Sequence, residues 1–122
     1  MSSDRLAVVE IKAFVPARDF ERSQAFYQAL GFTRASVGDG IAYFHHGTSS
    51  FLLQDFHVQA HTDNFMMHLL VEDVQAWHDR ASEAARQFET RIGSPEDQPW
   101  GMRDFPLWDP SGVLWRIGQN LR

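Results

Sequence analysis

The sequence predicts an α+β fold made of two βαβββ modules within a single domain, residues 1–122. Short apolar runs separated by turn sequences indicate strands, and two longer segments show helical spacing. The order of strand, helix and three strands occurs twice, with a period of about 60 residues. Identity between the two halves is faint, so the repeat is one of pattern. We expect the modules at about 7–56 and 64–120.

The first module is predicted to open with a strand at 7–15, where apolar and polar residues alternate until Pro16. Asp19 is a suitable N-cap, and Gly31 is placed to end the helix. Between them one helical face carries apolar and small side chains: Phe20, Ser23, Phe26, Tyr27 and Leu30. Three short strands follow at 32–37, 41–46 and 51–56, joined by turns at 38–40 and 47–50. Residues 57–63 are polar and are expected to be a linker.

The second module repeats this order. A strand is expected at 64–71, and Glu72 or Asp73 is expected to cap the next helix. The apolar face of that helix consists of Val74, Trp77, Ala81, Ala84, Ala85 and Phe88. A short strand is expected at 90–93, and residues 94–101 are predicted to form a loop.

The segment 100–120 is predicted to be the closing hairpin, with its turn at Asp109-Pro110-Ser111-Gly112. After the turn, Trp115 shares one strand face with Val113 and Ile117 and is expected to pack under the helices. The opposite face carries Arg116. A long cation there either extends to solvent or lines a cavity.

Composition excludes several functions. The chain has no cysteine, so it can form neither a disulfide nor a thiolate metal site. Its net charge is −5 without a basic cluster, which disfavours nucleic acid as a partner. An acidic surface suits a cationic small molecule, although it also serves solubility alone. No apolar run reaches membrane-spanning length and the N-terminus has no secretory pattern, so we expect a cytoplasmic protein without a membrane partner.

Two segments resemble a known superfamily: VPARDFERSQAFYQALGF at 15–32 and LWDPSGVLWRIGQN at 107–120. They are similar to the opening strand–helix and the closing hairpin of vicinal-oxygen-chelate proteins, the glyoxalase/bleomycin resistance/dioxygenase superfamily. A late WGM and the RIGQN ending most resemble the bleomycin-resistance proteins. The resemblance implies two modules that form a cupped mixed sheet with helices on its outer face. It also implies a homodimer with pockets at the subunit junction and sometimes an exchanged first strand, although a monomer remains compatible.

Enzymes of this superfamily hold a metal ion on cup-facing strands, at positions that the resemblance places near Lys12 or Glu10, at Gln54, near Met66 or His68, and at Arg116. Arg116 has no lone pair to offer an ion, and Met66 is a soft ligand. The sequence therefore predicts no metal, no cofactor and no catalytic residue. The alternative is a glyoxalase- or dioxygenase-like enzyme with an atypical metal site of His68, Gln54 and Glu10.

By this resemblance the chain is expected to bind and sequester a bulky, partly cationic aromatic compound such as a bleomycin-type antibiotic, and so to confer resistance. A different metabolite is the remaining alternative. Trp100 and Phe56 are candidate aromatic walls, although Trp100 could equally anchor its own loop. Gln54, His68 and Arg116 would orient polar groups of the ligand. Arg116 opposes a purely cationic ligand unless an acid such as Glu10 neutralises it.

Overall fold

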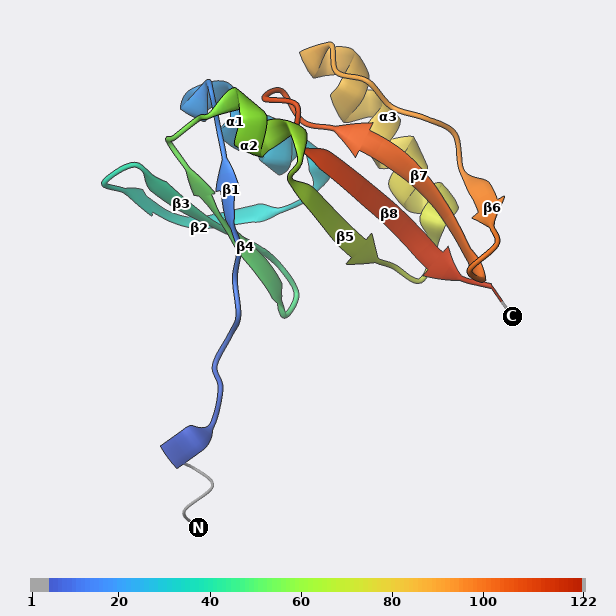
Figure 1. Ribbon diagram of the computed structural model, residues 1–122, viewed down its shortest axis with the longest axis horizontal. Helices are drawn as coiled ribbons and strands as arrows, with labels where there is room; N and C mark the ends of the chain where they lie inside the picture. Colours follow the sequence, from blue (N-terminus) through green and yellow to red (C-terminus); the bar gives the residue numbers. More distant parts are fainter. Residues whose placement is uncertain (1–4, 122) are drawn as a thin grey trace.

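Two four-stranded sheets, one from each module, form the framework of this protein in a computed structural model that describes residues 5–121 (Figure 1). The first sheet has the order β1-β4-β3-β2 and the second β5-β8-β7-β6. In each sheet the first strand runs parallel to the last strand of its module, and the other pairs are antiparallel. The predicted α+β fold of two βαβββ modules is confirmed.

The elements of the first module are β1 (Phe14–Pro16), α1 (Phe20–Leu30), β2 (Thr33–Gly38), β3 (Ile41–His46) and β4 (Ser49–Gln54). Those that follow are α2 (Gln59–Asp63), β5 (Met66–Leu70), α3 (Val74–Phe88), β6 (Glu96–Gln98), β7 (Met102–Trp108) and β8 (Leu114–Asn120). None of these helices is both long and apolar enough to span a membrane.

Three sequence predictions differ from the structure. Residues 7–13 were expected in the first strand, but β1 begins only at Phe14, because the segment before it has no neighbouring strand to pair with along its length. The expected linker at 57–63 contains the short helix α2. The strand expected at 90–93 is only an isolated bridge between Ile92 and Leu107, and the edge strand β6 lies instead within the predicted loop at 94–101.

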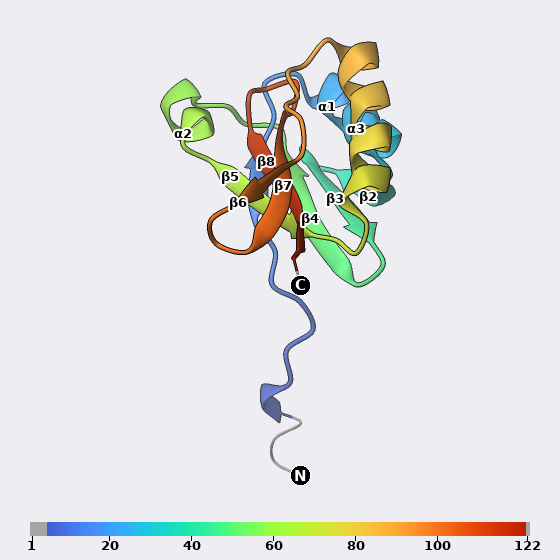
Figure 2. The same ribbon diagram turned by 90° about the vertical axis from the view of Figure 1, so that its right-hand side faces the viewer.

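Helix boundaries follow the predicted capping residues. The Asp19 side chain accepts a hydrogen bond from the Arg22 amide at 3.1 Å, and Gly31 ends α1 with φ of 119°. Of the two candidates for α3, Asp73 is the cap, since its side chain accepts from the Ala76 amide at 3.0 Å. In Figure 1 α1 and α3 lie behind the sheets, and in Figure 2 they lie together to the right of them.

Aromatic side chains fill the space between the two modules. Trp115 of β8 is buried, and its ring centroid lies 5.6 Å from that of Tyr27, 5.4 Å from that of Phe51 and 5.8 Å from that of Phe32. The prediction that Val113, Trp115 and Ile117 pack under the helices is confirmed by their burial. Because a strand alternates its faces, the residues next to them, including Arg116, lie on the opposite face.

One buried polar network joins these modules. The Tyr27 hydroxyl donates to Asp109 Oδ2 at 2.6 Å and accepts from Trp115 Nε1 at 2.8 Å. Asp109 Oδ1 accepts from the backbone amides of Ser111 and Val113, which fixes the β7–β8 turn. Burial raises the pKa of Asp109, and burial together with the neighbouring Asp109 carboxylate raises the pKa of Tyr27 well above 10.0.

Removing the hydroxyl in Tyr27→Phe leaves a buried carboxylate oxygen and a buried indole N–H without this partner. We expect the free energy of unfolding at pH 7 to fall by about 2–3 kcal/mol, measured by urea denaturation followed by circular dichroism. Tyr43→Phe is the matched control, because the Tyr43 hydroxyl also donates to a carboxylate, that of Glu10, but in a part-buried position. Equal losses in both variants would contradict a special role for the buried network.

The same hydroxyl predicts an alkaline signature. A tyrosine whose folded pKa is raised contributes stability that is complete below the unfolded pKa of about 10 and is lost as pH rises above it. Wild type should therefore lose up to about 1.4 kcal/mol per pH unit above pH 10 through Tyr27 alone. Tyr27→Phe lacks this contribution, so the stability gap between the two proteins should narrow from pH 9 to pH 11. A constant gap would show that the Tyr27 pKa is not raised in the folded protein.

Candidate functional site

The sheet faces turned away from α1 and α3, called here the open faces, carry the polar residues of the candidate site. On the first sheet, these polar residues gather around the carboxylate of Glu10, a residue that precedes β1. Its carboxylate accepts from Lys12 Nζ at 2.6 Å, the Tyr43 hydroxyl at 2.7 Å and Ser50 Oγ at 2.8 Å. These bonds, led by the one from Lys12, lower the pKa of Glu10 to about 2. Of the N-terminal arm, residues 5–13, these bonds attach Glu10, and through it Lys12, to β3 and β4, whereas the large apolar side chains of the arm stay exposed.

On the second sheet, Arg116 is paired with a buried carboxylate. Its Nη1 donates to Asp104 Oδ1 at 3.1 Å, and Gln98 Nε2 donates to the same oxygen at 3.0 Å. Asp104 is only 1% exposed. The suggestion that Glu10 neutralises Arg116 is therefore wrong, because Glu10 pairs with Lys12 and Asp104 supplies the charge beside Arg116.

His68 lies opposite Arg116 in the parallel β5–β8 pair. Its Nε2 is 3.3 Å from Met102 Sδ. His68 also lines a pocket of about 440 Å³ between the two sheets. The wall of this seam pocket comes from the arm, the β3–β4 hairpin, β5 and the aromatic core: Val9, Glu10, Ile11, Phe32, Thr48, Ser49, Ser50, Phe51, Met67, His68, Leu69, Leu70 and Trp115.

The structure brings only some of the predicted site residues together. His68 and Arg116 are neighbours on one open face. Trp100 lies in the β6–β7 turn, two residues after Gln98, whose side chain donates to Asp104, the partner of Arg116. Gln54 ends β4 on the other sheet, and Phe56 follows it. In Figure 1 the β6–β7 turn and the segment after β4 lie at opposite ends of the molecule. The five residues therefore do not surround one pocket within a single chain.

The residues of the metal alternative are likewise divided. Glu10 and His68 line the seam pocket, whereas Gln54 does not. Within residues 5–121, no group of three or more His, Cys, Asp or Glu side chains is arranged to hold a metal ion.

Sequence reasoning missed the partners that hold these groups: Tyr43, Ser50, Gln98, Met102 and Asp104. Strand parity could have found Asp104. Counting back from the turn at 109–112 places Pro106 opposite Arg116 and Asp104 on the same face, two residues further along β7. The contacts of Glu10 carry no such signal, since they join an arm outside the sheet to two strands distant in sequence.

Comparison with known proteins agrees with this architecture. The model of the Glyoxalase/Bleomycin resistance protein/Dioxygenase superfamily matches residues 6–117. A bleomycin resistance protein from Klebsiella pneumoniae is 30% identical over 114 residues, which cover 87% of this chain and 88% of that protein.

Two solved structures are also similar. A bleomycin-binding protein crystallised with bleomycin has a TM-score of 0.79 and 27% identity, with 93% of this chain and 99% of that chain covered. A bleomycin resistance determinant encoded on the transposon Tn5 has a TM-score of 0.77 and 25% identity, with 93% and 98% covered. The chain thus belongs to the glyoxalase/bleomycin resistance protein/dioxygenase superfamily.

Proposed function

We propose that this protein binds and sequesters a bulky, partly cationic aromatic antibiotic of the bleomycin type without altering it, in the cytoplasm. The observation that carries the proposal is the similarity, over 93% of this chain, to a protein crystallised with bleomycin. Sequestration requires tight binding, and a Kd of about 1 μM corresponds to roughly −8 kcal/mol.

The aromatic side chains on the surface support this proposal. Trp100 is 63% exposed and Phe56 is 53% exposed, so both rings are free to stack on a flat ligand. Trp100 does not bury its ring as a loop anchor would. Gln54, His68 and Arg116 are proposed to orient polar groups of the ligand.

The charges on the open face are consistent with a cationic ligand. Arg116 alone would repel such a molecule, but the adjacent Asp104 carboxylate offsets its charge at 3.1 Å. The chain as a whole carries a net charge of −5, which attracts cations over longer distances.

A homodimer is part of the proposal. Figure 2 shows the N-terminal arm extending away from the body of the protein. Its apolar side chains are almost fully in solvent, with Val9 and Ile11 each 93% exposed. A second copy that packs against the arm would bury this surface. A two-fold arrangement could also place Phe56 of one copy near Trp100 of the other, since the two residues lie far apart within a single chain.

Trp100→Ala should weaken the binding of metal-free bleomycin by at least about 1 kcal/mol, or roughly fivefold in Kd, because a stacking surface is lost. Isothermal titration calorimetry measures the effect on wild type and variant. Trp108→Phe serves as the control, since Trp108 lies outside the proposed site. Unchanged affinity in Trp100→Ala would remove this residue from the site, and absence of binding to wild type would contradict the proposed function.

Charged substitutions in the arm test the dimer. Val9→Asp combined with Ile11→Asp should convert the protein from dimer to monomer, because two carboxylates cannot be buried in an apolar contact without partners. Sedimentation equilibrium measures the mass. Val37→Asp is the matched control, as Val37 is an exposed valine of β2 away from the arm. A wild-type monomer, or a double variant that stays dimeric, would contradict an interface formed by the arm.

A further inference from the structure

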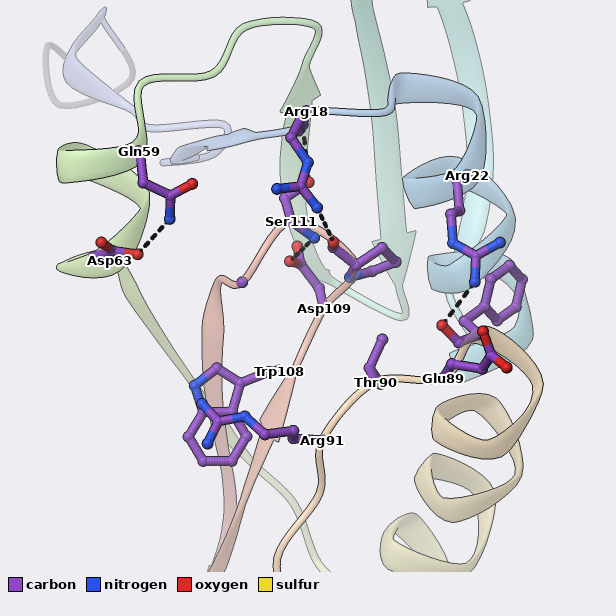
Figure 3. A pocket seen from close by; sticks show the side chains of 13 residues that line it. Arg18, Arg22, Gln59, Asp63, Glu89, Thr90, Arg91, Trp108, Asp109 and Ser111 are labelled. Atoms are coloured by element: carbon purple, nitrogen blue, oxygen red, sulfur yellow. Dashed lines mark hydrogen bonds between the residues drawn. The ribbon is translucent and has the colours of Figure 1, made fainter.

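A second and larger pocket lies away from the seam pocket. Its volume is about 660 Å³, and it is formed by the start of α1, the segment after α3, α2 and the β7–β8 turn (Figure 3). It shares no residue with the seam pocket and contains none of the five proposed ligand-binding residues. Its size is in the range of small-molecule sites, which is about 300–1,000 Å³.

Arginines reach this pocket from three different segments of the chain. Arg18 precedes α1, Arg22 belongs to its first turn, and Arg91 follows α3. Three of the 11 lysine and arginine side chains therefore line this one pocket, together with three carboxylates, those of Asp63, Glu89 and Asp109.

Neutral groups hold each of these arginines in place. Arg22 Nη2 donates to the Phe88 carbonyl at 2.7 Å, and Arg18 Nη2 lies 3.5 Å from the Pro110 carbonyl. The Arg91 guanidinium lies 4.0 Å from the centre of the Trp108 ring. Figure 3 shows the two side chains against each other. Within residues 5–121, none of the three has a carboxylate oxygen within 4.0 Å.

Carboxylates also line the pocket, but they have other partners or positions. Asp109 is buried and accepts from Tyr27 and from the turn amides. Asp63 accepts from Gln59 at 2.6 Å. Glu89 is the C-cap residue of α3. Among residues 5–121, these carboxylates therefore share the pocket with the three arginines but form no ion pair with them.

We propose that this pocket binds a small polyanion with two or more phosphoryl or carboxylate groups. A planar guanidinium donates paired N–H groups that match both kinds of oxyanion. Three guanidiniums distributed around a pocket of this volume suit an extended molecule better than a single inorganic ion. The site is separate from the antibiotic site, so either proposal can fail without the other.

Calorimetric titration of the full chain with pyrophosphate and with citrate, at constant ionic strength, tests the proposal. Saturable binding of at least one, with a Kd below about 1 mM, is expected. The two probes distinguish phosphoryl from carboxylate recognition. Arg22→Gln and Arg91→Gln should each raise the Kd at least about fivefold, because each removes a charged donor from a solvent-exposed position without disturbing the core.

Two further variants make the outcome specific. Arg86→Gln is the matched control, since Arg86 is an exposed arginine of α3 that pairs with Glu83 outside the pocket, and it should bind as wild type does. Glu89→Gln should strengthen binding, because it removes a negative charge from the pocket wall. No saturable binding of either probe, an equal loss in Arg86→Gln, or weaker binding in Glu89→Gln would overturn the proposal.

Discussion

The arrangement of the two modules depends on the hydrogen bonds of Asp109, which join α1 to the β7–β8 turn. One carboxylate oxygen accepts from Tyr27 of α1, and the other fixes the turn that begins β8. Tyr27 in turn accepts from Trp115 of β8. A single buried acid thus sets the position of the last strand against the helix of the other module. A buried carboxylate is costly without hydrogen-bond partners, so other packings of β8 against α1, which would break these bonds, are disfavoured.

The open face follows from that constraint. With Trp115 held under the helices, Arg116 must lie on the opposite face, beside His68 of β5 and Asp104 of β7. Glu10 has the same organising role on the first sheet, where it attaches the arm to Tyr43 and Ser50. Both open faces therefore present charged groups that are already paired. A ligand can therefore contact these faces while the Glu10–Lys12 and Arg116–Asp104 ion pairs stay intact.

Sequence patterns were sufficient where the information is local. Asp19, Gly31 and the turn at 109–112 fixed the ends of elements, and apolar spacing predicted both modules. The patterns failed where structure depends on distant partners. Residues 7–13 alternate like a strand but have no strand alongside, and β6 forms only because β7 pairs with it. The separation of Phe56 from Trp100 follows from how the modules pack, which local patterns do not encode. Asp104 is a different case, because the alternation of the β7–β8 hairpin places it on the same face as Arg116.

Sequestration as proposed means that the ligand is bound and released unchanged. The most direct measurement is a tryptophan-fluorescence titration of wild type with metal-free bleomycin, followed by recovery of the ligand and mass spectrometry. We expect saturable binding at a Kd of about 1 μM or lower and a recovered ligand of unaltered mass after prolonged incubation. A flat titration, or a ligand whose mass changes with time in the presence of the protein, would contradict it.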